Sequence, residues 1–511
     1  MKSAGRIIIA YWLAAYRELC GKARLSFKES MAIFTKRSST NLHIPSPPLS
    51  KQSFHHWLNV NGGYKDVWHL AWPLFLAQGS STILQFIDRM FLTWYSAEGM
   101  AAAGPAGMLA FSMQAFFIGM TGYSSVFVAQ YTGAKKPSQA VSVVWQALYL
   151  SIASSVILLL GIPLGGMVFK LAGHPEAIRR YERIFFDIFL LGSAVFLSNA
   201  AVSGYFIGKG RTRVVLLTNI IGVLTNIVSD YLLIFGNLGF PRMGVAGAAI
   251  SSIIAQTLGL IINIVFFLRD PEVRKHSGAW KPRLELITRI IRFGSANGLQ
   301  FALDMLGWTT FLLLVGRMGV VDLAASNIAF QINTFAFFPI IGFAMAASTL
   351  VGQNLGRNDA DGANRSVWSA MHIGLMFTGI VAVFYVFAPD IFIAPFGAEA
   401  NKAEFAPVRH LSIILLRFIS AYCLFDVGNL VLSAALKGAG DTLFVMLISS
   451  SISVCCMLLP VFFLCVPAGG LGVIGAWCFL TLTVLTLSIA FLLRYLHGRW
   501  QHMRVIECEV V

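Results

Sequence analysis

Long apolar stretches, separated by short polar turns, run through this chain from about residue 67 to residue 495. Each stretch exceeds the roughly 20 residues that a helix needs to cross the hydrocarbon core of a bilayer. Because lipid offers the backbone no hydrogen-bond partners, apolar segments of this length must be helical. The pattern therefore predicts an all-α polytopic membrane protein. Its twelve predicted transmembrane helices lie at about 67–95, 105–131, 139–165, 182–208, 213–236, 245–268, 286–316, 322–353, 366–388, 409–436, 442–466 and 472–495.

These twelve segments form two sets of six that resemble each other. VAQYTGAKK, from Val128, aligns with VGQNLGRND, from Val351, and GVAGA at Gly244 aligns with GVIGA at Gly472. GKGRT after the fourth segment matches KGAGDT after the tenth more weakly. Six helices return the chain to its starting side, so the copies share one orientation and predict two parallel lobes around a central cavity, as in transporters. The expected parts are a basic N-terminal cytoplasmic extension (1–65), an N-lobe (66–270), a cytoplasmic linker (271–285), a C-lobe (286–497) and a cytoplasmic tail (498–511).

One apolar segment carries a carboxylate in its middle. Asp304 lies within FGSANGLQFALDMLGWTTFLLLVG, the stretch from Phe293 to Gly316. A charge at membrane depth costs at least about 2.5–3.5 kcal/mol on insertion scales, so it normally faces a cavity or a partner. At 100° per residue the same face carries Asn297, Gln300, Asp304 and Trp308. This stripe predicts an aqueous cavity beside the helix.

The first half of the chain holds its own deep acids. Asp88 lies in STILQFIDRMFLTWY beside Arg89, and its alternative role is a structural ion pair. In LTNIVSDYLLIFG, Asn226 and Asp230 are four residues apart on one helical face. A carboxylate with a carboxamide suits a proton or a sodium ion, although an interhelical hydrogen bond would use the same groups. Asp187, close to Arg183 at an outer helix end, is interpreted as an interfacial charge.

The tenth segment supplies the fourth deep acid. Asp426 shares a face with Tyr422, four residues before it, and with Asn429, three residues after it. Arg417 is nine positions back and lies on the opposite face, so it cannot neutralise Asp426 along its own helix. In the alignment of the two halves none of these acids matches another acid, which predicts that the two halves have different functions.

Composition and charge narrow the function further. The chain is 57% hydrophobic and 12% charged, against roughly 25% charged in soluble domains. The net charge of +15 does not indicate a nucleic-acid partner, because the predicted inner loops and the tail hold 18 Lys and Arg residues and the outer loops hold eight. That asymmetry predicts that both termini are cytoplasmic. The seven Cys residues show no metal-binding spacing, and no ATP-binding motif is present, so transport would use an ion gradient and no cofactor.

The order and spacing of these features resemble the multidrug and toxic compound extrusion (MATE) family over about residues 65–497. The resemblance rests on the twelve helices in two repeats, the first-helix pattern from Pro73 to Asp88, VAQYTGAKK after the second helix and ALKGAGDT after the tenth. It implies antiport of organic cations out of the cytoplasm, driven by sodium or proton entry. The chain departs from the family pattern where DTxxVG is expected, since it has DRMFLTW, and its N-terminal extension is unusual.

The resemblance also implies roles for individual residues. The coupling ion, Na+ or H+, would bind in the N-lobe at Asp88, Asn226, Asp230 and Ser252, where Ser252 replaces a cation-site Thr of some members. Substrate or ion would bind in the C-lobe at Asp304, Asp426, Gln300, Tyr422 and Asn429. Because both lobes carry acids, the possible Na+ site is either Asp88, Asn226 and Asp230 or Asp304 and Asp426.

Two alternatives remain from the sequence. A flippase of lipid-linked sugar phosphates on the same superfold would need Arg and Lys in its cavity, but the deep charges of this chain are chiefly Asp. A membrane-embedded enzyme would need a convergent His, Ser or Cys constellation, and His372 stands alone in its helix. We therefore expect a monomeric, non-enzymatic exporter of small organic cations in a bacterial inner membrane.

Overall fold

The computed structural model describes residues 57–171, 173–397, 402–467 and 469–507. Nearly all of these residues are helical, and no strand occurs among them. Most of the predicted N-terminal extension lies outside the described residues. In chain order the long helices are α3 (Tyr64–Tyr95), α4 (Ala97–Gly122), α5 (Ser124–Gly133), α6 (Pro137–Leu159), α7 (Ile162–Leu171), α8 (Glu176–Leu191), α9 (Ser193–Gly208), α10 (Thr212–Phe235), α11 (Val245–Arg269), α13 (Leu284–Gly316), α14 (Val320–Gly356), α15 (Ala360–Phe387), α17 (Lys402–Ala439), α18 (Thr442–Ile452) and α19 (Gly472–Leu496). Two short helices, α12 (Pro271–Lys275) and α16 (Pro389–Gly397), lie between them.

The predicted all-α membrane fold is confirmed, and each of the twelve predicted segments is helical. In the described part of the chain, ten helices are long and apolar enough to cross a membrane, and an eleventh span arises if α8 and α9, bent by 45°, count as one. The remaining segment is α3, which carries Lys65, Asp66, Asp88 and Arg89 and does not reach the same apolarity. The count of twelve is therefore not fully confirmed.

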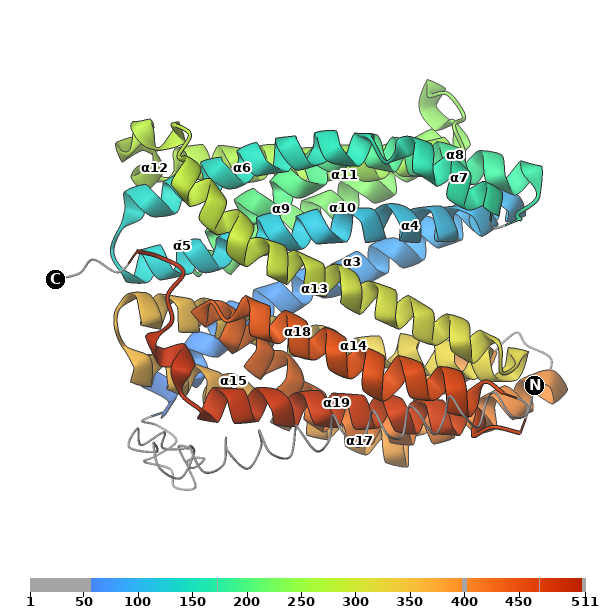
Figure 1. Ribbon diagram of the computed structural model, residues 1–511. Coiled ribbons are helices and arrows are strands. Elements are labelled where there is room, and N and C mark those ends of the chain that lie inside the picture. The colour runs from blue at the N-terminus through green and yellow to red at the C-terminus, as the bar shows by residue number, and fades with distance from the viewer. Residues whose placement is uncertain (1–56, 172, 398–401, 468, 508–511) are drawn as a thin grey trace, which may run out of the picture.

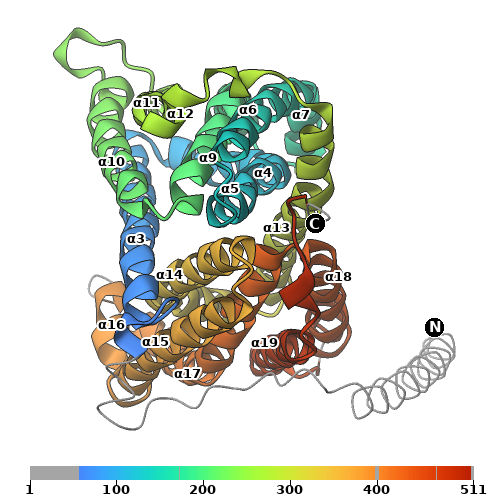
Figure 2. The same cartoon turned by 90° about the vertical axis from the view of Figure 1, so that its left-hand side faces the viewer.

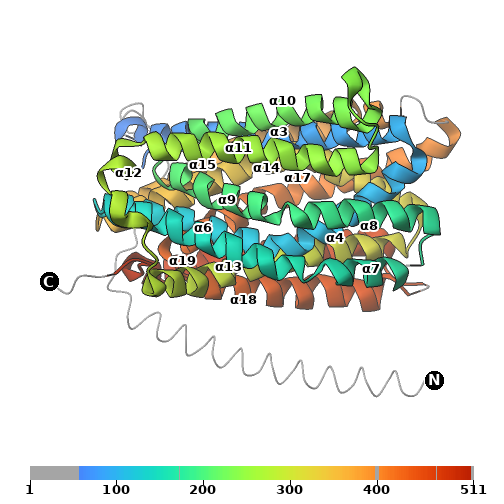
Figure 3. The same cartoon turned by 90° about the horizontal axis from the view of Figure 1, so that it is seen from above.

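The helices pack as two bundles that run along one common axis (Figures 1 and 3). The first bundle contains α4 to α11 and the second contains α14 to α19. Figure 2 shows α3 and α13 on opposite sides of the molecule, each extending from one bundle to the other. Short turns at the two ends of the molecule connect neighbouring antiparallel helices.

The crossing of α3 and α13 is visible in their packing. Val67, near the start of α3, belongs to the apolar core of the second bundle, whereas Phe91, near its end, packs in the first. Helix α13 runs the other way, with Ile290 in the core of the first bundle and Phe311 in the core of the second. Each half of the chain therefore begins with a helix that bridges the two bundles.

One end of the molecule is closed by hydrogen bonds between the bundles. Gln130 of α5 donates to the carbonyl of Gly438 at 2.9 Å, and Gln353 of α14 donates to the carbonyl of Gly208 at 2.8 Å. Tyr123 donates to the carbonyl of Lys437 at 2.6 Å. This end also carries α12 and the last described residues (Figure 1), and the predicted orientation makes it the cytoplasmic end.

Candidate functional site

The acids of the first bundle meet where α10 packs between α3 and α11. Asn226 and Asp230 are fully buried on one face of α10, as their four-residue spacing predicts. With its NH2 group toward the acids, the Asn226 amide donates to Asp88 Oδ1 at 2.8 Å and to Asp230 Oδ2 at 3.0 Å. The same amide accepts from the backbone N–H of Ser252 at 3.2 Å. One carboxamide thus joins two carboxyl groups from two helices.

Helix α11 completes this cluster with two adjacent serines. The predicted Ser252 contributes its backbone N–H, while its hydroxyl donates to the carbonyl of Ala248 at 3.1 Å. The hydroxyl that reaches the acids belongs to Ser251, which is fully buried and donates to Asp230 Oδ1. Ser251 was missed because both serines follow GVAGAAI, and the sequence alone does not fix the rotation of α11 against α10.

The chemistry of this cluster is that of a cation or proton site. Asp88 and Asp230 lie within hydrogen-bond reach of each other. Two carboxylates held this close repel one another when both are ionised, and a proton or a cation between them removes the repulsion. The surrounding donors are carboxylate, carboxamide and hydroxyl oxygens, which hard cations prefer. Among the described residues no group of three His, Cys, Asp or Glu side chains is placed to hold a metal ion.

The acid of α13 has a different environment. Asp304 remains accessible and accepts a hydrogen bond from Gln300 at 3.4 Å, and Gln300 also approaches the hydroxyl of Ser449 on α18 at 3.3 Å. The ammonium of Lys437, in the last turn of α17, is close enough to attract Asp304 electrostatically. Lys437 is one of the 18 Lys and Arg residues that the sequence places in the inner loops and the tail, and only the packing of α17 shows that its charge acts on Asp304.

The acid of α17 is more enclosed. Asp426 is 8% exposed and accepts a hydrogen bond from Asn429 at 3.0 Å, as their shared face predicts. Tyr422 is buried one turn earlier on the same helix. Arg417 is exposed, away from these groups. In the described part of the chain, Asp426 therefore has one amide hydrogen-bond partner and no cation bonded to it.

The polar stripe predicted on α13 does not act as one cavity face. Asn297 donates to the carbonyl of Gly119 at 2.8 Å and joins α13 to α4. Trp308 packs with its ring 4.3 Å from that of Phe330, at the edge of an apolar core. Only Gln300 and Asp304 keep the predicted polar role, because neighbouring helices cover the other two positions.

The structure brings together the predicted residues of the first bundle but divides those of the second into two sites. Asp304 bonds to Gln300, whereas Asp426 bonds to Asn429, and no hydrogen bond in the described part of the chain joins the two acids. His372 is hydrogen-bonded to Tyr64 at 3.0 Å among aromatic rings, which suits packing rather than nucleophilic chemistry.

Comparison with known proteins identifies the family. The family model MatE matches residues 73–232 and 298–463, which together cover more than half of the chain. A probable multidrug resistance protein NorM of Thermotoga maritima is 27% identical over 452 residues, covering 88% of this chain and 95% of that protein. A NorM protein of the same description from a Synechococcus strain is 27% identical over 389 residues, covering 74% and 82% of the two chains.

A solved structure has the same fold. It is the outward-facing conformation of a MATE multidrug resistance transporter of the MOP superfamily, which matches with a TM-score of 0.77 at 20% identity, covering 88% of this chain and 97% of that one. These relatives are transporters and span nearly the whole of the present helical region. The chain therefore belongs to the MATE family of integral membrane transporters.

Proposed function

We propose that this transporter exports small organic cations in exchange for a sodium ion or a proton that binds at Asp88, Asn226, Asp230 and Ser251. The observation that carries the proposal is the Asn226 amide, which joins the buried Asp230 carboxyl group of α10 to the half-buried Asp88 carboxyl group of α3. Such an arrangement would be costly unless it binds a positive charge. The description of the relatives as multidrug resistance proteins supports the export of small compounds.

The substrate would bind at the acids of the second bundle. Asp426 has a single amide hydrogen-bond partner, so its negative charge is available to an organic cation. The negative charge of Asp304 is already attracted by Lys437, and an organic cation would have to compete with that lysine. Trp308 lies one turn after Asp304 and is only half-buried against Phe330, so its remaining exposed surface would supply the apolar and cation–π contact that amphipathic cations prefer.

Coupling would arise because the ion and the substrate favour different arrangements of the two bundles. An ion at Asp88 and Asp230 removes the repulsion between these acids and so stabilises the packing of α3 against α10. Since α3 also packs in the second bundle, its position connects the ion site to the substrate side. A difference in ion affinity between two states is sufficient to shift their populations.

The test is efflux from liposomes that contain the purified protein. A fluorescent organic cation is loaded, and either a sodium gradient or a pH gradient is imposed. We expect one gradient to drive efflux and Asp230→Asn to reduce this drive by at least about tenfold, the effect of losing about 1.4 kcal/mol of ion binding. Asp390→Asn, at an exposed ion pair with Arg409, is the matched control and should leave efflux unchanged.

Three results would contradict the proposal. Unchanged gradient-driven efflux in Asp230→Asn would show that the coupling ion does not bind in the first bundle. Loss of gradient-driven efflux in Asp304→Asn alone would show that it binds in the second bundle. Absence of efflux under both gradients, with a folded protein, would instead favour the flippase of lipid-linked sugar phosphates.

A further inference from the structure

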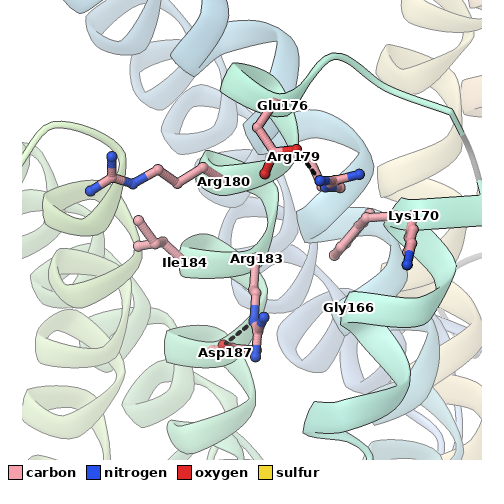
Figure 4. A pocket seen from close by; sticks show the side chains of 9 residues that line it. Gly166, Lys170, Glu176, Arg179, Arg180, Arg183, Ile184 and Asp187 are labelled. Atoms are coloured by element: carbon pink, nitrogen blue, oxygen red, sulfur yellow. Dashed lines mark hydrogen bonds and ion pairs between the residues drawn. The ribbon is translucent and has the colours of Figure 1, made fainter.

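A cavity of about 490 Å³ lies between α7 and α8, at the end of the molecule opposite to α12 (Figures 1 and 4). It is lined by α7 and α8, whereas the acids described above lie on α3, α10, α13 and α17. The charged residues that line it are Lys170, Glu176, Arg179, Arg180, Arg183 and Asp187. Four cations face two acids, so the lining carries a net charge of +2 at neutral pH.

The two acids do not neutralise all of these cations. Glu176 pairs with Arg179 but is 83% exposed, so solvent weakens its hold on the guanidinium. Asp187 lies 3.6 Å from Arg183. Lys170 has no ion pair in the described part of the chain, and in Figure 4 it projects from α7 beside the Arg179 side chain of α8. An anion placed there would meet charges from two helices.

Small residues of α7 shape the cavity. Gly165 packs so closely on the ring of Phe186 that a Cβ atom would lie 2.3 Å from it, which holds α7 against α8. At Gly166 a Cβ atom would lie 4.0 Å from Cζ of Arg183, so the absent side chain leaves the guanidinium open to the cavity. Phe169, whose ring centroid lies 5.7 Å from that of Phe186, supplies an apolar wall.

The outer face of α7 indicates the kind of ligand. Leu164, Met167 and Leu171 are 53%, 60% and 83% exposed, as expected for side chains that contact lipid. The cations therefore lie at the end of a lipid-facing helix, at the level where phospholipid headgroups meet the protein. Arginine binds phosphate oxygens with paired hydrogen bonds, and lysine adds a point charge.

We propose that this cavity binds the phosphate group of an anionic membrane lipid. The phosphodiester lies between Lys170, Arg179 and Arg183, and the acyl chains follow the exposed face of α7. The net positive charge of the lining favours an anionic headgroup over a zwitterionic one.

The test is native mass spectrometry of the detergent-solubilised protein titrated with phosphatidylglycerol, with phosphatidylcholine and with inorganic phosphate. The wild type is expected to bind its first phosphatidylglycerol about tenfold more tightly than phosphatidylcholine, and the double variant Lys170→Gln/Arg179→Gln should lose this preference, since each charge-assisted hydrogen bond contributes about tenfold. Gly166→Leu should weaken binding without removing a charge, because the side chain enters the cavity.

The control is Arg317→Gln/Arg409→Gln, which removes two exposed cations elsewhere at the same end of the molecule. It should keep the preference for phosphatidylglycerol. Equal binding of the two lipids by the wild type, or an unchanged preference in both cavity variants, would overturn the proposal. Binding of inorganic phosphate at the same residues without a preference for phosphatidylglycerol would overturn the lipid assignment.

Discussion

At the scale of single residues, the most concentrated charge network at the predicted cytoplasmic end surrounds Asp270, which follows α11. Its carboxylate accepts hydrogen bonds from Arg211 at 2.5 Å, from Lys209 at 3.4 Å and from the backbone N–H of Glu272 at 2.9 Å. The Asp270 and Lys209 side chains are 1% and 6% exposed. Burial alone would raise the pKa of Asp270, but the Glu272 N–H and the charges of Lys209 and Arg211 hold it below its usual value.

Replacing Asp270 by Asn should therefore destabilise the protein by about 3 kcal/mol at pH 7, because Lys209 stays buried with one carboxylate partner fewer. A depressed pKa means that this stabilisation is complete above about pH 5 and is lost as the pH falls through the folded pKa. Thermal denaturation in detergent should thus show a difference between wild type and variant that narrows between about pH 5 and pH 2.

The exposed ion pair between Asp390 and Arg409, at 2.6 Å, provides the comparison. Asp390→Asn should change stability by no more than about 1 kcal/mol at any pH, since solvent screens an exposed pair. A difference for Asp270→Asn that stays constant down to about pH 2 would show that its charge does not stabilise the fold.

At the scale of helices, close approach between α4 and α13 fixes the crossing of α13 between the bundles. A Cβ atom on Gly298 would lie 2.0 Å from the carbonyl oxygen of Phe116, so no larger residue fits without separating the helices. Asn297 adds its hydrogen bond to the carbonyl of Gly119 beside this contact. Gly294 and Gly119 are also in close contact across this interface, which therefore depends on several glycines and on the amide of Asn297.

Gly298→Ala should destabilise the protein by about 1–3 kcal/mol, because the added methyl group meets rigid backbone. Gly307 lies on the same helix with no atom within 4 Å of its Cβ position, and Gly307→Ala should be neutral or stabilising by up to about 1 kcal/mol. Melting temperatures of the two variants in the same detergent check the prediction. Equal melting temperatures would mean that α13 moves away from α4 at little cost.

The same helices indicate how much could be read from the sequence. Length and apolarity predict the long helices, and the four-residue spacing predicts that Asn226 and Asp230 share a face, because both follow from local geometry. Periodicity also places Asn297 beside Asp304, yet it cannot tell which neighbour covers each turn, and α4 covers Asn297. The choice of Ser251 over Ser252 depends likewise on the rotation of one helix against another, which is a tertiary property.

At the scale of the whole molecule, the repeat motifs explain how the predicted cytoplasmic end is closed. Gln130 and Gln353 occupy equivalent positions in VAQYTGAKK and VGQNLGRND, and each donates to a carbonyl in the other bundle. The acceptors, Gly438 and Gly208, also align between KGAGDT and GKGRT. The two hydrogen bonds are thus copies of one contact, which the parallel repeat places symmetrically about the molecular axis.

The segment after α19 breaks this symmetry. The backbone N–H of Val505 donates to Gln130 Oε1 at 2.9 Å, so Gln130 makes two hydrogen bonds across this end. Trp500 packs in the second bundle and Val505 in the first, which means that the segment between them extends from one bundle to the other. Among the described residues, no equivalent hydrogen bond reaches the Oε1 atom of Gln353.

Opening of this end must break these hydrogen bonds. Removing them should therefore favour the open state, and the effect should be larger for Gln130 than for Gln353. With about 1 kcal/mol for each neutral hydrogen bond, Gln353→Ala should raise the open-to-closed ratio about fivefold, and Gln130→Ala about thirtyfold. Spin labels at the exposed positions Lys275 and Arg357, one on each bundle, would report the two populations as two distance distributions. Removing residues 499–511 should raise the ratio in the wild type but add less in Gln130→Ala, since that variant has already lost the bond to Val505. Equal ratios for the two Gln variants would contradict a role of the terminal segment in holding this end closed.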